Sequence, residues 1–158
     1  MNSFNISPQL IAHYFVCTID REAGDSITHL KLQKLLYYAQ AWTMVLFNKT
    51  LFEEDFQAWM HGPVLPSIWE SYKHYGFDSI PISNFEDALP NEVTELLAEI
   101  KSVYGEKSAK YLEELTHSEL PWREARARLP IEARSTKPIS KQTMFEFYFA
   151  LNQKLENA

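Results

Sequence analysis

The stretch THLKLQKLLYYAQAWTMVLF, residues 28–47, limits most strongly what this chain can fold into. Its apolar residues recur at the three- and four-residue spacing of a helix, and they occupy nearly every side of that helix. A helix of this kind normally forms the buried centre of a globular domain. Thr28 can cap the first turn with its hydroxyl group, and the polar start argues against a membrane-spanning segment. We therefore expect a buried central helix at about residues 28–47.

The rest of the chain predicts a mainly α fold. Its 158 residues suit a single compact domain, and only 4 of them are glycine. Large side chains change their spacing in the segment that follows the central helix, which is compatible with a short strand pair near residues 51–60. We expect one multi-helix domain over residues 1–158, packed around the central helix.

Composition bears on the partners and on the cellular location. The net charge of −6 disfavours attraction of the whole protein to nucleic acid. The single cysteine, Cys17, permits no internal disulfide, and the N-terminus lacks the pattern of a signal peptide, so we expect a cytoplasmic protein that is not in the membrane. The five histidines show no metal-binding spacing, and no glycine-rich phosphate loop is present. We predict no metal, no cofactor and no catalytic site, and hence a protein that is not an enzyme.

Residues 122–141 form a basic segment in a chain that is acidic elsewhere. Arginine grips carboxylates or phosphates with paired donors, so this segment is a candidate partner-binding surface. The alternative is a solvated helix and linker whose cations pair with the domain's own acids. The candidate partner-binding residues are Arg123, Arg126, Arg128, Arg134 and Lys137, with Lys141 at the end of the segment and only Glu124 and Glu132 opposing them.

Two sequence motifs at a fixed separation carry a family resemblance. KLQKLLYYAQAW in the central helix, AWMHGPVLP after it and the later THSELPW together resemble the SocA-like Panacea domain, formerly the phage-associated GepA proteins. The resemblance covers almost the whole chain, although His29 stands where the family often has proline. The matching residues are Lys31, Leu32, Lys34, Leu35, Leu36, Tyr37, Trp59, Gly62, Pro63, Val64, Pro66, Pro121 and Trp122.

The resemblance implies an antitoxin of a toxin–antitoxin pair. Such a protein neutralises a cognate protein toxin by direct contact, or presents the toxin to a ClpXP-type protease, and neither route needs a catalytic site. We expect the motif residues around Gly62 to form a turn packed against the central helix, with Trp59 supplying apolar area. The rival interpretation is a nucleic-acid-binding or phage regulatory protein that uses the basic 122–141 segment. The identity of the toxin and the oligomeric state stay open.

Overall fold

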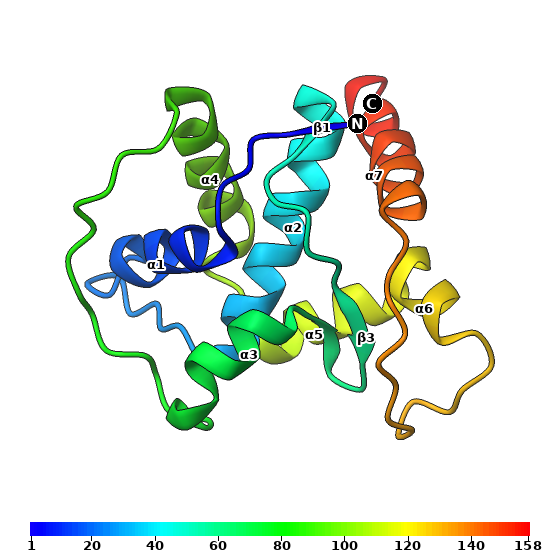
Figure 1. Cartoon of the computed structure of the whole chain (residues 1–158), viewed down its shortest axis with the longest axis horizontal. Coiled ribbons are helices and arrows are strands. Elements are labelled where there is room, and N and C mark those ends of the chain that lie inside the picture. Colours follow the sequence, from blue (N-terminus) through cyan, green and yellow to red (C-terminus); the bar gives the residue numbers. More distant parts are fainter.

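The computed structural model describes all 158 residues and consists of helices and two short strand pairs (Figure 1). The helices are α1 (Pro8–Thr18), α2 (His29–Phe47), α3 (Pro66–Tyr72), η1 (Lys73–Tyr75), α4 (Asn91–Tyr104), α5 (Ala109–Ser118), α6 (Leu120–Arg126) and α7 (Lys141–Glu156). The strands are β1 (Asn2–Ser3), β2 (Lys49–Thr50), β3 (Gln57–Trp59) and β4 (Gly62–Val64). The prediction of a mainly α fold is confirmed.

Helix α2 runs through the middle of the molecule, with α1 and α4 on one side and α7 on the other (Figure 1). Every residue from Lys31 to Ala41 is buried, so no face of this part of the helix reaches the solvent. The hydroxyl of Thr28 accepts a hydrogen bond from the backbone N–H of Lys31 at 3.3 Å. The predicted central helix is therefore confirmed, together with its cap.

Two buried glutamines of α2 bind the backbone of the segments that pack against it. The side chain of Gln40 accepts a hydrogen bond from the N–H of Leu51 at 2.7 Å and donates one to the carbonyl of Phe52 at 2.9 Å. Gln33 makes the same pair of bonds to the N–H and carbonyl of Leu65, at 2.9 and 3.3 Å. Both amides satisfy backbone groups that would otherwise be buried without partners. The chain that follows α2 is thereby fastened back onto it.

Strands β3 and β4 form an antiparallel hairpin, in which Trp59 pairs with Gly62. The observed pair extends to Val64, beyond the predicted range of 51–60, because the chain reverses at residues 60–61. Gly62 has a φ of +110°, and a Cβ atom there would lie 2.5 Å from Cε of Lys34. Only glycine fits such a position without strain. The hairpin therefore reaches α2 through a close contact between Gly62 and Lys34.

A buried carboxyl group joins α2 and α7 to the corner between α5 and α6. Glu119, between α5 and α6, accepts hydrogen bonds from the hydroxyl groups of Tyr38 at 2.6 Å and Tyr148 at 2.8 Å. Burial raises the pKa of Glu119 above its ordinary value. These two bonds fix the corner between α5 and α6 against α2 and α7. Helix α6, which carries part of the basic segment, therefore has a defined position on the domain.

Candidate partner-binding surface

The basic segment lies on α6 and on the loop of residues 127–138, which we call the basic loop; it projects at the lower right of Figure 1. Four of its cations are exposed and form no ion pair with an acid of this chain, namely Arg123, Arg128, Arg134 and Lys137. Lys141 differs, because its Nζ contacts Oδ1 of Asp55 and the carbonyl of Glu53. The alternative, in which the cations pair with acids of the domain, therefore holds for Lys141 but not for the four exposed cations.

Arg126 does not belong to this exposed surface. Its side chain is only 2% exposed, and its guanidinium donates to the carbonyl oxygens of Pro130 at 2.8 Å and Ala133 at 2.7 Å in the basic loop. It also donates to the carbonyl of Ala58 in β3 at 3.0 Å. The prediction that Arg126 contacts a partner is therefore wrong. Its guanidinium holds the basic loop in shape and attaches that loop to the hairpin.

The basic loop and the hairpin form one connected unit. Trp122 of α6 is buried, and its indole N–H donates to the carbonyl of Trp59 at 2.8 Å. The end of the loop runs beside β3, where the N–H of Ala58 donates to the carbonyl of Lys137 at 2.8 Å. A further bridge joins Gln57 to Pro138. The backbone that carries the exposed cations is thus tied to β3 at both ends of the loop.

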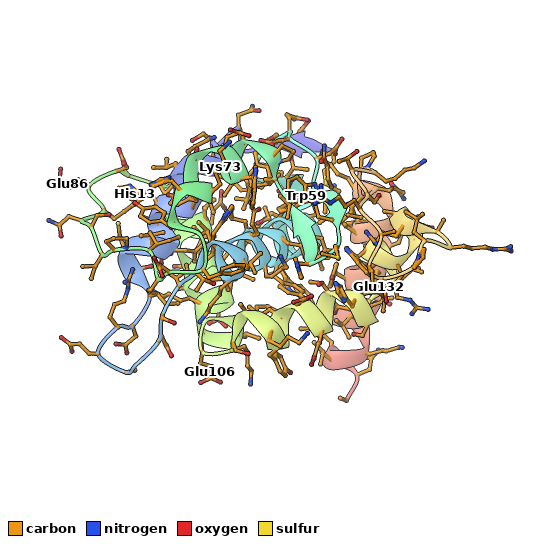
Figure 2. The ribbon with its side chains drawn as sticks, turned by 90° about the horizontal axis from the view of Figure 1, so that it is seen from below. His13, Trp59, Lys73, Glu86, Glu106 and Glu132 are labelled. Carbon is orange, nitrogen blue, oxygen red and sulfur yellow. The ribbon has the colours of Figure 1, made fainter.

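A groove of about 430 Å³ opens between the hairpin, the beginning of α2, helix α3 and the basic loop. Its lining residues are His29, Leu30, Gln33, Trp59, Met60, His61, Val64, Trp69, Arg134, Ser135 and Thr136. In Figure 2, Trp59 lies on the hairpin, between Lys73 at the end of α3 and Glu132 in the basic loop. We call this feature the groove. It brings the hairpin motif and the basic loop to one place on the surface.

Trp59 faces this groove rather than the core. Its ring packs against that of Trp69 with a centroid distance of 5.3 Å, and both side chains are half-buried. Its aromatic neighbour comes from α3, while His29, Leu30 and Gln33 of the central helix line the same groove. The sequence analysis missed Trp69 and Met60 as groove residues. No periodic signal could have found them, since the groove is assembled from separate segments.

Arg134 is the cation of the groove that lacks an internal partner. Burial lowers the pKa of His29 to about 4, so its imidazole is uncharged at neutral pH. His61 is already in contact with Glu113, at 3.0 Å between Nδ1 and Oε1. Arg134 makes no ion pair, and its side chain lies at the edge where the basic loop meets the groove. The groove is thus largely apolar, with one unpaired cation at its rim.

Most of the motif positions lie in the interior, and Lys31, Lys34, Gly62 and Pro121 are all buried. Trp59 and Pro66 are half-buried. No cluster of three or more histidine, cysteine or acidic side chains could hold a metal ion. None of the helices has the length and apolar character that crossing a bilayer requires.

Comparison with known proteins gives one match. A family model described as "Antitoxin SocA-like, Panacea domain" matches residues 32–123, which include most of α2, the hairpin, α3, α4, α5 and the first part of α6. Three of the four unpaired cations, Arg128, Arg134 and Lys137, lie beyond the matched residues. No curated protein and no solved structure was found that matches this chain.

Proposed function

Because this chain belongs to the SocA-like Panacea family of antitoxins, we propose that it neutralises a cognate protein toxin by binding it directly through its basic surface. The basic surface consists of the exposed side chains of Arg123, Arg128, Arg134 and Lys137. One observation carries the proposal: these four cations are unpaired, although the protein has a net charge of −6 and many acids that could have paired with them.

Electrostatics and preorganisation both favour a protein partner with an acidic face. Opposite charges across an interface steer the two proteins together and fix their orientation. The basic loop is already ordered by Arg126, whose guanidinium bonds to carbonyls at 2.7 and 2.8 Å within the loop. A loop that is ordered before binding loses less conformational entropy on association. The basic surface is therefore suited to tight binding of carboxylates that have a fixed arrangement.

Charge reversal tests this surface in cells that express the cognate toxin. We expect the variant Arg123→Glu, Arg128→Glu and Lys137→Glu to lose rescue, because like charges would then face each other across the interface. Arg126 is left unchanged, since its replacement would disorder the loop. The matched control is Lys73→Glu, Lys110→Glu and Lys154→Glu, three reversals on other parts of the surface, and we expect it to rescue fully. Circular dichroism should show both variants folded.

Two results would count against the proposal, one from the rescue experiment and one from a nucleic-acid binding measurement. Full rescue by the basic-surface variant would show that these cations do not contact the toxin. Salt-sensitive binding of the wild-type protein to DNA or RNA at physiological salt would favour the nucleic-acid alternative, because each phosphate contact releases counterions. We expect no such binding.

We further propose that binding alone is sufficient for neutralisation. Equal rescue in hosts with and without a ClpXP-type protease would support that view. Rescue only in the protease-containing host would instead indicate that the antitoxin presents its toxin for degradation.

A further inference from the structure

We propose that the groove receives a large apolar side chain of the toxin, with a carboxylate one or two residues away that pairs with Arg134. The inference rests on the proposed function and assigns to it a specific contact. The toxin segment would be exposed and would carry an aromatic or long aliphatic residue beside an aspartate or glutamate. The groove would recognise the apolar side chain, and the basic loop would recognise the acid.

Most of the apolar residues of the groove are not used to build the core. The core contains 31 buried residues, with further half-buried side chains packed against it. Four of the five apolar groove residues belong to neither set, namely Leu30, Trp59, Met60 and Trp69, whereas Val64 is buried with 3% of its surface exposed. Apolar groups gathered at one surface hollow, outside the core, are typical of a binding site. Tryptophan and methionine are also among the residues enriched in protein interfaces.

The polar groups in the floor of the groove are already satisfied within the protein. Both ends of the Gln33 amide are bonded to the backbone of Leu65. The amide nitrogen of Gln33 also lies 3.1 Å from Nε2 of His29, whose imidazole is uncharged at neutral pH because burial lowers its pKa to about 4. A polar ligand group placed on this floor would lose its water and find few free partners. An apolar side chain gives up no hydrogen bonds to water when it is placed there, so the floor of the groove favours an apolar side chain.

The rim of the groove adds a single positive charge at a fixed place. Arg134 follows Ala133, whose carbonyl oxygen accepts a hydrogen bond from the buried Arg126 at 2.7 Å. The backbone at Arg134 is therefore held, while its guanidinium is exposed and unpaired. A volume of about 430 Å³ lies within the roughly 300–1,000 Å³ of ordinary ligand pockets. That space suits one large side chain, and the arginine beside it is complementary to a carboxylate.

The first test uses the whole protein and a blocked dipeptide, N-acetyl-Phe-Glu-amide, as the probe. NMR spectra resolve the indole N–H signals of the four tryptophans, which single Trp→Phe variants assign. We expect the signals of Trp59 and Trp69 to shift on titration, and that of Trp42, which does not line the groove, to stay in place. N-acetyl-Phe-Gln-amide should bind about fivefold more weakly, as the loss of one exposed charge pair predicts. N-acetyl-Ala-Glu-amide should bind more weakly still.

The variant Arg134→Gln provides the control for the carboxylate. It should bind the Phe-Glu and Phe-Gln probes equally well, because the cation that distinguishes them is gone. Absence of any shift at Trp59 and Trp69, or equal binding of the Phe and Ala probes, would overturn the assignment of the groove. Equal binding of the Glu and Gln probes by the wild-type protein would overturn the role of Arg134.

The second test separates this inference from the proposed function. We expect Trp69→Ala and Arg134→Glu each to weaken toxin binding about tenfold or more, in the range of interface hot spots. Phe77→Ala, which removes an aromatic ring that is 88% exposed outside the groove, should bind like the wild type. If the groove variants bind like the wild type while the basic-surface variant does not, the groove inference is wrong and the proposed function stands. If the wild type neither binds nor rescues, both fail.

Discussion

Trp122 and Trp59 are joined by one hydrogen bond, yet their surroundings are opposite. The ring of Trp122 is 4% exposed, belongs to the core and stacks on His117 at a centroid distance of 3.9 Å. The ring of Trp59 is half-buried, lies outside the core and packs against Trp69 at the groove. Both belong to the motifs that carry the family resemblance. Membership of a motif therefore does not tell whether a side chain stabilises the fold or faces a partner.

The largest effect on stability should come from replacing Trp122, whose ring lies in the core. We expect Trp122→Ala to reduce the free energy of unfolding by about 3–5 kcal/mol, because it leaves a cavity and removes the donor to the Trp59 carbonyl. Urea unfolding measures this change. Trp122→Phe keeps most of the apolar volume and should cost clearly less. A loss below about 1 kcal/mol for the alanine variant would mean that Trp122 is not part of the core in the way described.

A second effect, which grows with pH, should come from Lys34 behind the hairpin. Burial lowers the pKa of Lys34 from the ordinary 10.5 to about 7. The unfolded chain therefore holds this proton up to higher pH than the folded chain does, so the wild type gains stability relative to Lys34→Met as the pH rises from 7 toward 10.5. The expected slope between these values is about 1.4 kcal/mol per pH unit.

Urea unfolding of both proteins at several pH values gives this slope. Lys154→Met, at the exposed end of α7, is the control for losing one positive charge. A stability difference between the wild type and Lys34→Met that does not change with pH would show that Lys34 keeps its proton in the folded protein.

The smallest effects should come from the groove. We expect Trp59→Ala and Trp69→Ala each to reduce the free energy of unfolding by about 1 kcal/mol, because a half-buried ring outside the core removes less apolar surface from water on folding. Equilibrium unfolding monitored by circular dichroism avoids dependence on tryptophan fluorescence. Should Trp59→Ala cost as much as Trp122→Ala, the contrast between the interior and the groove would be lost.

The arginines of α6 show the same contrast. Arg123 and Arg126 lie three residues apart in one basic run, and the sequence gives no reason to separate them. In the structure Arg123 is exposed, whereas Arg126 is buried and bonded to backbone carbonyls of β3 and of the basic loop. The difference arises because α6 ends at Arg126 and the chain then folds back over it. The acceptors come from residues that are brought close only by the tertiary fold.

Local interactions made much of the fold predictable. The hydroxyl group of Thr28 caps α2 as expected, and those of Ser108 and Ser140 cap α5 and α7 in the same way, since a cap involves only residues within three positions of one another. The central helix was predictable because its apolar residues cover all its sides. The hairpin was less predictable. Its second strand lies at residues 62–64, beyond the expected range of 51–60, because strand pairing depends on where the chain turns.

The sequence by itself determined the mainly α fold, the central helix and the presence of a basic segment, since periodicity, capping and charge are properties of neighbouring residues. The tertiary structure decided which cations are free and where the groove lies. Those features combine the hairpin, α2, α3 and the basic loop, whose meeting depends on long-range packing. It also decided that Trp122 and Arg126 serve the interior while Trp59 and Arg134 face outward. The burial of a side chain depends on which segments pack over it, and its neighbours along the sequence do not determine those segments.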